Sequence, residues 1–340
     1  MAVADELRDR GAEVAFVGAR GRVESELVPA AGYPIDLISV SGIDRRNPLR
    51  AATAAARAAA AVPAARRVLR ARGADVVLGG GGFVAGPAGL AAVSLRLPLV
   101  LTEADSHLGL ANRLLAARAR RVCLAFPIPG RDGERYLVTG RPVPAAVMRA
   151  DRARARERFG IPADVRCLLV MGGSQGARSN NRAALAAFGG DADRSFHVLH
   201  LAGTRDYAEL RDALAEAGPE DYTLLEYEPD LGDCLAACDL VLGRAGGSIF
   251  EVAAAGRPAV LVPYPHATAD HQSANAAWME RAGAAIVIPD AGLDPGRLAA
   301  EVDGLLADGE RLDRMAEASR RLARPDAAAR VADEVLAAAQ

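Results

Sequence analysis

One stretch of the chain, from Val165 to Phe188, limits what the sequence can fold into more than any other. Its apolar run from Cys167 to Met171 is typical of a buried parallel strand. The run breaks at Gly172-Gly173, and a helical pattern starts near Gln175. Free N–H groups at the start of a helix, beside glycines that let the backbone approach a ligand closely, favour an anion such as a phosphate or diphosphate. A tight turn that binds no ligand is the alternative.

This glycine turn differs from two common phosphate-binding loops. The loop of nucleoside triphosphatases, G-x-x-x-x-G-K-[ST], needs a lysine, and the chain contains none. The dinucleotide spacing G-x-G-x-x-G is absent from the turn as well. The turn therefore indicates a phosphate site of another kind.

The same alternation of apolar strands and helical segments runs through the whole chain. We expect strands at 13–18, 37–40, 75–78, 99–102, 122–125 and 136–138, and then at 165–171, 197–201, 223–225, 240–242, 259–262 and 285–288. This pattern predicts an α/β fold of two doubly wound, Rossmann-like domains that face a cleft. A stiff linker, Gly140 to Pro144, separates an N-terminal domain of residues 1–143 from a C-terminal domain of residues 144–340, which includes the C-terminal helices.

Composition narrows the class of protein further. The 340 residues are 51% hydrophobic and 25% charged, as expected for a soluble globular chain with two cores. A net charge of −2 gives no global attraction to nucleic acid, so we expect no nucleic-acid partner. We expect the four cysteines to be buried structural thiols rather than metal ligands, because no histidine or second cysteine pair lies near them in the sequence.

The N-terminal domain opens on an unusual element. Residues 2 to 10 have helical spacing and end at Gly11, whereas a doubly wound domain normally opens with a strand followed by a ligand-binding loop. We therefore expect the chain as written to be truncated by one strand and one loop, and to have little or no activity. The C-terminal domain should still fold and bind its ligand.

Two segments bear on membranes. The uncharged run from Val76 to Leu95 is as long as a membrane span, but its glycines predict a buried strand, a glycine loop and a short helix. Arginines at 45, 46 and 50 precede an alanine-rich helix, which we expect Pro63 to interrupt and whose second half carries more arginines. Such a helix docks on anionic lipid headgroups or is simply a solvated face.

Further polar loops follow strands of the C-terminal domain. Gly243-Arg244-Ala245-Gly246-Gly247-Ser248 opens a helix over 249–255, with Glu251 in its first turn. A carboxylate there either stabilises the helix or accepts hydrogen bonds from sugar or ribose hydroxyls. Residues 266–275 gather hydrogen-bonding side chains after another strand, which suits a polyhydroxylated ligand.

With these loops in place, the chain closely resembles the MurG-type N-acetylglucosaminyltransferases over nearly its whole length. Five segments carry the resemblance, namely Gly80 to Pro87, Glu103 with Gly109 to Arg113, Gly172 to Arg178, Arg244 to Gly246 with Glu251, and Asp270 to Gln272 with Asn275. The resemblance implies a GT-B fold, UDP-N-acetylglucosamine as donor, inversion at the anomeric carbon, and neither metal nor cofactor. It also implies that the acceptor is the undecaprenyl-linked muramyl-pentapeptide of peptidoglycan synthesis, which the enzyme would meet as a peripheral protein at the anionic cytoplasmic face of the bacterial plasma membrane.

The resemblance also implies roles for single residues. Glu103 and Asp105 would be catalytic and line the acceptor side. The donor would be bound by Arg141, Ser174, Gln175, Gly176, Glu228, Arg244, Gly246, Gly247, Ser248, Glu251, Gln272 and Asn275. Within this set, Ser174 to Gly176 would hold the diphosphate, Ser248 and Glu251 the diphosphate and ribose, and Gln272 and Asn275 the sugar.

The chain departs from the family's pattern at several positions. Thr102 and Asp105 stand where the family has histidine and asparagine, and Pro144 stands where it has a donor-binding arginine, a role we assign to the nearby Arg141. Glu228 occupies a usually aliphatic position whose backbone contacts the uracil. The family's glycine-rich loop with a histidine, G-G-T-G-G-H, falls before Met1. Two alternatives stay open, a UDP-N-acetylglucosamine 2-epimerase and a non-catalytic UDP-sugar binder.

Overall fold

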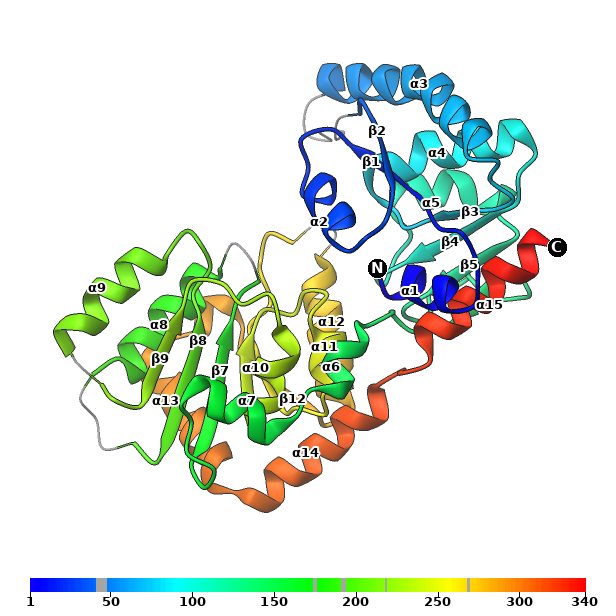
Figure 1. Cartoon of the computed structure of the whole chain (residues 1–340). Helices are drawn as coiled ribbons and strands as arrows, with labels where there is room; N and C mark the ends of the chain where they lie inside the picture. Colours follow the sequence, from blue (N-terminus) through cyan, green and yellow to red (C-terminus); the bar gives the residue numbers. More distant parts are fainter. Residues whose placement is uncertain (41–47, 174–175, 191–193, 218, 268–269) are drawn as a thin grey trace. The chain divides into compact units, whose positions relative to one another are not determined.

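The structure of the chain is a computed structural model that describes residues 1–40, 48–173, 176–190, 194–217, 219–267 and 270–340. It consists of two compact units, one formed by Met1–Pro142 with Asp326–Gln340 and the other by Val143–Pro325. Each unit is built on parallel strands connected by helices (Figure 1). The predicted pair of doubly wound, Rossmann-like domains is therefore confirmed.

The second unit contains one six-stranded parallel sheet in the order β12-β11-β10-β7-β8-β9. Its strands are β7 (Arg166–Met171), β8 (Phe196–Leu201), β9 (Tyr222–Leu225), β10 (Leu240–Gly243), β11 (Ala259–Leu261) and β12 (Ala285–Val287). The chain moves outward from β7 to β9 on one side and from β10 to β12 on the other. Open α/β sheets bind ligands at such a reversal of strand order, outside the carboxyl ends of the strands. The loops after β7 and β10 thus form the expected ligand edge.

Helices cover both faces of this sheet. They are α6 (Ala145–Arg149), α7 (Arg152–Phe159), α8 (Arg178–Phe188), α9 (Tyr207–Ala217), α10 (Leu231–Ala237), α11 (Ile249–Ala254), α12 (His271–Arg281), α13 (Pro295–Ala307) and α14 (Gly309–Leu322), with a 3-10 turn at Asp290–Gly292. Helices α8 and α13 pack together on one face, where Phe188, Leu298 and Val302 join the strand residues in one core cluster. Each side chain of this kind contributes about 1.5–3 kcal/mol when fully buried.

In the described part of this unit, three helices begin at an aspartate whose side chain caps the helix. The carboxylates of Asp151, Asp294 and Asp308 accept hydrogen bonds from the N–H groups three residues later, at the starts of α7, α13 and α14. A cap of this kind satisfies a backbone donor that the helix itself leaves unpaired and is worth about 1 kcal/mol. Local sequence therefore determines where these helices begin.

The first unit contains two separate sheets. A four-stranded parallel sheet has the order β3-β4-β5-β6, and β1 pairs with β2 in a second sheet. The strands are β1 (Phe16–Ala19), β2 (Ile35–Ile38), β3 (Val77–Gly79), β4 (Leu99–Glu103), β5 (Arg121–Leu124) and β6 (Tyr136–Val138). The helices are α1 (Ala2–Asp9), α2 (Glu24–Ala30), α3 (Pro48–Ala71), α4 (Gly82–Leu95), α5 (Leu110–Leu115) and α15 (Ala327–Ala339), with a 3-10 turn at Ala116–Arg118. Within the described part of the chain, no strand pairing joins β1 to β3.

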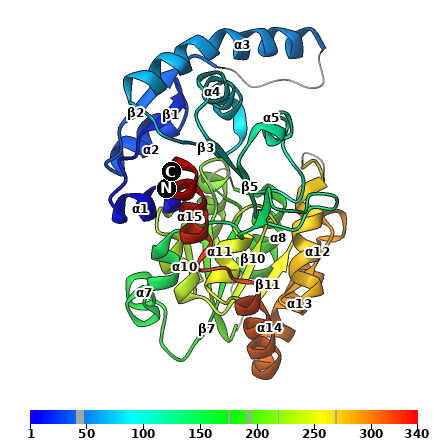
Figure 2. The ribbon, with the colours of Figure 1, turned by 90° about the vertical axis from the view of Figure 1, so that its right-hand side faces the viewer.

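The expectation that Pro63 interrupts its helix is wrong, because α3 continues through that residue. A proline inside a helix removes one backbone hydrogen bond and crowds the preceding turn. Packing offsets this cost, since α3 lies over α4 (Figure 2) and buries Ala61, Ala65 and Leu69 in a shared core cluster.

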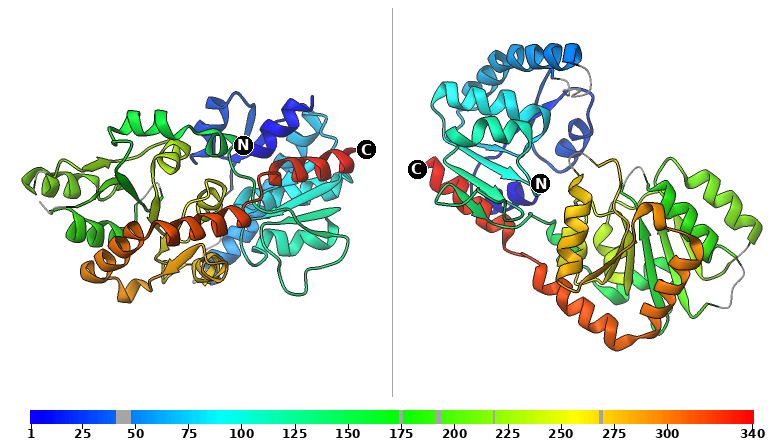
Figure 3. Two further views of the ribbon diagram at one scale, coloured as in Figure 1. Left: turned by 90° about the horizontal axis from the view of Figure 1, so that it is seen from below. Right: turned by 180° about the vertical axis from the view of Figure 1, so that it is seen from behind.

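The C-terminal helix also differs from expectation. The sequence placed α15 with the C-terminal domain, but it belongs to the first compact unit. Figure 3 shows α15 beside α1, and Val331 and Val335 of α15 share a core cluster with Val3 and Leu7 of α1. The apolar stripes of α1 and α15 cover each other, because an apolar stripe that faced water would give up the free energy gained by burying it.

Two other features can be compared with the sequence. All four cysteines are free and buried, as expected, and burial raises the pKa of the Cys123 thiol to about 12. In the described residues, no helix combines the length and the apolar character needed to cross a bilayer.

Candidate functional site

The loop after β7 brings the backbone of two glycines into very close contact with its surroundings. A Cβ added at Gly172 would lie 2.3 Å from the backbone nitrogen of Ala177, and one at Gly176 would lie 2.1 Å from the carbonyl oxygen of Ala202. Gly176 also has a φ of +74°, which side-chain-bearing residues rarely adopt. The turn therefore requires glycine at both positions. The predicted donor residues Ser174 and Gln175 lie outside the described residues.

Arg244 connects the loop after β10 to the start of α8. Its Nη2 donates to Oγ of Ser179 at 2.6 Å, and its Nη1 donates to Oδ1 of Asp290 at 2.6 Å and to the carbonyl oxygen of Val262 at 3.0 Å. The Ser179 hydroxyl donates to the same carboxylate oxygen of Asp290 at 2.7 Å. Burial acts to raise the pKa of Asp290, but the hydrogen bonds from Ser179 and Arg244 leave that pKa below its usual value. Arg244 thus joins three segments of this edge.

Helix α12 supports the same loop from another side. Asn275 is buried, and its Nδ2 donates to the carbonyl oxygen of Ala245 at 2.9 Å. The Oε1 of Gln272 accepts from the backbone N–H of Tyr264 at 2.9 Å, and its Nε2 lies 3.9 Å from the position of a Cβ at Gly246. The structure therefore brings Arg244, Gly246, Gln272 and Asn275 together around one loop.

The other predicted donor residues of this unit have different surroundings. Ser248 is the N-cap residue of α11, Gly247 precedes it, and the half-buried Glu251 lies in the first turn of that helix. The Glu228 carboxylate accepts from Nη2 of Arg158 at 2.6 Å and from the backbone N–H of Asp230 at 2.9 Å. The Glu228 side chain is therefore engaged in contacts within its own unit. Its backbone remains the part that is expected to contact the uracil ring.

In the first unit, Glu103 lies at the carboxyl end of β4 and organises the loop that follows. Its Oε2 accepts from the backbone N–H of Gly109 at 2.7 Å and from Nδ2 of Asn112 at 2.9 Å, and its Oε1 accepts from the N–H of Asp105 at 3.2 Å. Asn112 is buried and also donates to the carbonyl oxygen of Thr102 at 2.9 Å. Both carboxylate oxygens of Glu103 therefore hold the loop at 104–112.

A pocket of about 150 Å³ opens beside Glu103. It is lined by Thr102, Glu103, Ala104, Cys123, Thr139, Gly140, Arg141 and Pro142. These residues come from the carboxyl ends of β4, β5 and β6 and from the segment that follows β6. The structure thus brings the predicted catalytic Glu103 and the predicted donor residue Arg141 to one pocket of the first unit.

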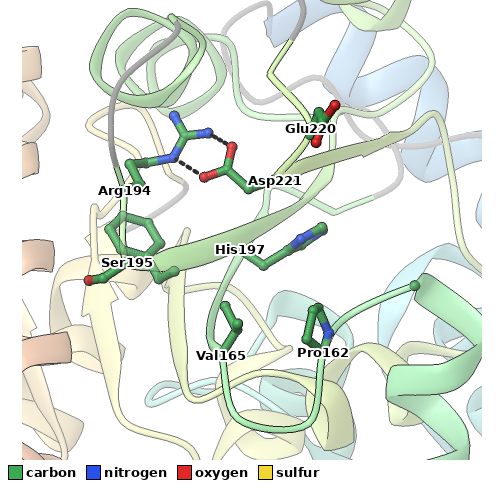
Figure 4. A pocket seen from close by; sticks show the side chains of 9 residues that line it. Pro162, Val165, Arg194, Ser195, His197, Glu220 and Asp221 are labelled. Atoms are coloured by element: carbon green, nitrogen blue, oxygen red, sulfur yellow. Dashed lines mark hydrogen bonds and ion pairs between the residues drawn. The ribbon is translucent and has the colours of Figure 1, made fainter.

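A larger cavity of about 300 Å³ lies at the opposite edge of the sheet in the second unit (Figure 4). It is formed near the amino ends of β7, β8 and β9, and Arg194 faces Asp221 across it with Nε donating to Oδ2 at 3.1 Å. Ligands of open α/β sheets bind at the carboxyl ends of the strands instead. This cavity is therefore separate from the candidate site.

Sequence reasoning overlooked Ser179, Asp290 and Asn181 as contributors to the site. Nδ2 of Asn181 donates at 2.8 Å to the carbonyl oxygen of Ala202, the atom that faces Gly176. No local signal could have found Asp290, because it follows Arg244 by 46 residues. Ser179 and Asn181 lie directly after the glycine turn, and their position was the available signal.

Known proteins similar to this chain share its two-domain organisation. A UDP-N-acetylglucosamine--N-acetylmuramyl-(pentapeptide) pyrophosphoryl-undecaprenol N-acetylglucosamine transferase from Methylococcus capsulatus is 41% identical over 336 residues, covering 98% of this chain and 92% of that protein. The crystal structure of Acinetobacter baumannii MurG matches with a TM-score of 0.78 and 28% identity, over 99% of this chain and 94% of the other. A UDP-GlcNAc 2-epimerase from Neisseria meningitidis, bound to UDP-GlcNAc, has a TM-score of 0.70 at 14% identity over 99% and 95% of the two chains, which shows a shared fold alone.

Two family models match the chain in the order of its domains. The glycosyltransferase family 28 N-terminal domain matches residues 1–124, and the glycosyltransferase family 28 C-terminal domain matches residues 167–331. Together with the near full-length relative, these matches establish that the chain belongs to glycosyltransferase family 28, among the MurG-type N-acetylglucosaminyltransferases.

Proposed function

We propose that this chain transfers N-acetylglucosamine from UDP-N-acetylglucosamine to the muramyl 4-hydroxyl of undecaprenyl-diphospho-muramyl-pentapeptide, with inversion at the anomeric carbon. One observation carries the proposal. The loops after β7 and β10 meet at the reversal of strand order, where the Arg244–Ser179–Asp290 contacts hold them together. The relative from Methylococcus capsulatus supports the choice of donor and acceptor, because its name states both.

The loop after β7 is the proposed diphosphate site. Gly172 and Gly176 keep the backbone clear of side chains in front of α8, an 11-residue helix. Its N-terminal N–H groups stabilise the charge that develops on the departing UDP. We assign Ser174 and Gln175 to the same diphosphate.

The loop after β10 and helix α12 complete the proposed donor site. Gly246, Gly247 and Ser248 lie at the start of α11, beside Gln272. We assign Glu251 to the ribose hydroxyls and Gln272 to the sugar. Asn275 acts through the backbone, since it is buried and bonded to Ala245.

The acceptor chemistry is assigned to the end of β4. In the reaction, the muramyl 4-oxygen forms a bond to the anomeric carbon, the bond from that carbon to UDP breaks, and a carboxylate takes the hydroxyl proton. Glu103 accepts three N–H donors from its own loop, so we assign it to holding that loop. Asp105 presents a half-buried carboxylate in the loop and is the proposed base. Arg141, on the same pocket as Glu103, is assigned to donor phosphate.

Arg45 and Arg46, which the sequence suggested for membrane docking, lie outside the described residues. Membrane docking is proposed instead for the surface formed by α4 and α5. Phe83, Leu90 and Leu114 are 51%, 45% and 64% exposed, although they are large and apolar. Arg113 is exposed next to Leu114. Apolar side chains flanked by arginine suit the boundary between anionic headgroups and acyl chains. We therefore propose that the protein binds peripherally to the cytoplasmic face of the plasma membrane, where a lipid-linked acceptor is found.

The test is a product assay with radiolabelled UDP-N-acetylglucosamine. Transfer predicts label in the lipid product and release of UDP only when the lipid acceptor is present. Formation of UDP-N-acetylmannosamine without acceptor would instead identify the 2-epimerase. Binding of the UDP-sugar without either product would identify the non-catalytic binder.

A further inference from the structure

A chain of hydrogen-bonded polar side chains, three of them buried, runs through the second unit against the loop that follows β7. Oη of Tyr222 lies 2.6 Å from Nδ1 of His200, and Nε2 of His200 lies 3.1 Å from Oδ1 of Asn181. Nδ2 of Asn181 donates to the carbonyl oxygen of Ala202 at 2.8 Å and to Oδ2 of Asp206 at 3.0 Å. His200 and Asn181 are 0% exposed and Asp206 is 2% exposed. These four side chains, Tyr222, His200, Asn181 and Asp206, are called the β8 network below.

The partners of the β8 network determine its protonation. The amide nitrogen of Asn181 must face Ala202 and Asp206, because both offer only acceptor oxygens there. Its Oδ1 can therefore only accept, so Nε2 of His200 carries the hydrogen. Nδ1 of the neutral ring is then an acceptor, and the Tyr222 hydroxyl donates to it. Every hydrogen bond from Tyr222 to Asp206 points in the same direction, which favours mutual strengthening.

The network ends at the backbone of the glycine turn. The Ala202 carbonyl that receives the Asn181 amide is the atom that a Cβ at Gly176 would strike. The backbone N–H of Asn181 donates to the carbonyl oxygen of Ala177 at 2.8 Å. Asn181 therefore holds this short segment through both its side chain and its backbone.

The outer end of the network is a charged pair. Nε of Arg178 donates to Oδ1 of Asp206 at 3.1 Å, and the Arg178 side chain is 50% exposed. Arg178 is the first residue of α8, directly after the glycine turn. The buried Asp206 carboxylate thus fixes the orientation of a solvent-facing guanidinium beside the proposed phosphate loop.

We propose that the β8 network is a positioning element of the donor site, which holds the Gly176–Ala177 backbone and the Arg178 guanidinium in place for a nucleoside diphosphate. This inference rests on the proposed function, since it explains how the proposed donor site is held in shape. His200 and Asn181 touch no substrate in it and act through Ala202, Ala177 and Asp206. Apolar side chains could fill the same space beside β8 equally well. A polar network in which every group has a hydrogen-bond partner, however, fixes one arrangement of its neighbours.

The decisive comparison uses two histidines of the same strand. His200→Phe fills the ring's place but leaves Oδ1 of Asn181 unpaired, whereas His200→Gln keeps a donor for it. His197→Phe is the matched control, because His197 is also buried and pairs with Thr223 at 2.9 Å, but lines the cavity at the amino end of the sheet. Affinity for UDP is measured by calorimetry, and thermal stability by melting temperature.

We expect UDP to bind His200→Phe at least about tenfold more weakly than wild type, which corresponds to about 1.4 kcal/mol. His200→Gln should retain affinity within about threefold, a change of less than 1 kcal/mol. His197→Phe should lower the melting temperature without changing UDP affinity. Equal affinity of His200→Phe and wild type, or equal weakening in His197→Phe, would overturn the inference. Wild-type protein that does not bind UDP would instead overturn the proposed function.

A second pair of measurements does not depend on the folding of His200→Phe. Tyr222→Phe removes a single hydroxyl and should weaken UDP binding by about threefold, as expected for the loss of one hydrogen bond at the far end of the network. In the wild-type protein, ¹⁵N chemical shifts should identify the tautomer of His200 with hydrogen on Nε2. Unchanged affinity in Tyr222→Phe, or the tautomer with hydrogen on Nδ1, would contradict the network as assigned.

Discussion

Arg244 donates a hydrogen bond from Nη2 to Oγ of Ser179 at 2.6 Å, and this contact joins the loop after β10 to the first turn of α8. The two segments belong to neighbouring strands, β10 and β7, between which the strand order reverses. One guanidinium therefore links the two proposed donor loops, in addition to the pairing of the strands that precede them.

Replacing Arg244 by alanine should weaken donor binding and stability together. The change leaves Asp290 and Ser179 without their cation, at a cost of about 1–3 kcal/mol for a hydrogen-bonded charged group. Arg182→Ala is the control, since Arg182 of α8 forms an ion pair with Glu209 of α9 in which the two side chains are 59% and 56% exposed, and such an exposed pair contributes little. Calorimetry with UDP-N-acetylglucosamine and urea unfolding measure the two effects. Equal behaviour of the two variants would show that Arg244 does not hold the loops.

Glu251 should contribute directly to donor affinity. Glu251→Ala removes a proposed acceptor for the ribose hydroxyls and should weaken UDP-N-acetylglucosamine binding by about 1–3 kcal/mol, the range for hydrogen bonds to a charged group. Glu310→Ala is the control, because Glu310 is 91% exposed on α14. Calorimetry that gives the same affinity for Glu251→Ala and Glu310→Ala would remove Glu251 from the site.

Glu103 should affect turnover more than donor binding. In Glu103→Gln one carboxylate oxygen becomes an amide nitrogen, which cannot accept from Gly109, Asn112 or Asp105. The loop that carries Asp105 then shifts, and we expect kcat to fall by about tenfold or more, because misplacement of a catalytic group is costly. The Kd for UDP should not change. Glu134→Gln, at an exposed position of the same unit, is the control, and a variant of Glu103 with normal kcat would refute this role.

Burial of His200 should make stability depend on pH. Burial lowers the pKa of His200 to about 3, from 6.5 in the unfolded chain. Between these values the unfolded state binds more protons, so the free energy of unfolding falls as the pH drops below about 6.5, by about 2 kcal/mol between pH 7 and pH 5. Urea unfolding should show a larger loss in wild type than in His200→Gln, which keeps the smaller contribution of His197, whose pKa burial also lowers. The same pH dependence in both proteins would assign it to other groups.

The α4–α5 surface should bind anionic vesicles through both apolar contact and charge. Phe83→Ser and Leu114→Ser should each weaken vesicle binding by about fivefold, because each removes about 1 kcal/mol of apolar burial. Binding of the wild-type protein should fall steeply with salt, since headgroup attraction is screened. Met148→Ser, at an exposed apolar position of the second unit, is the control. If the wild-type protein does not bind anionic vesicles at low salt, the α4–α5 surface is not a membrane-docking surface.

The sequence by itself determined the strands, the glycine turns and the starts of several helices. Each expected strand is present within a few residues, because a buried parallel strand is an uninterrupted apolar run and its pattern is local. The turn at Gly172–Gly176 was visible for the same reason, since only glycine fits where a backbone lies against another backbone. Asp151, Asp294 and Asp308 likewise mark the starts of helices, because aspartate is a preferred N-cap residue whose carboxylate accepts from the N–H three residues later.

Only the tertiary structure decided which groups meet. Glu228 pairs with Arg158 across 70 residues, and Arg244 meets Ser179 across 65 residues, so no local pattern could show that these side chains are already engaged. Helix α3 continues through Pro63 because its neighbour α4 covers it, and α15 returns to α1 because two apolar stripes match. Contacts between residues far apart in the sequence form only once the chain has folded. At this site, these contacts decide which side chains hold a loop and which are proposed to bind a ligand.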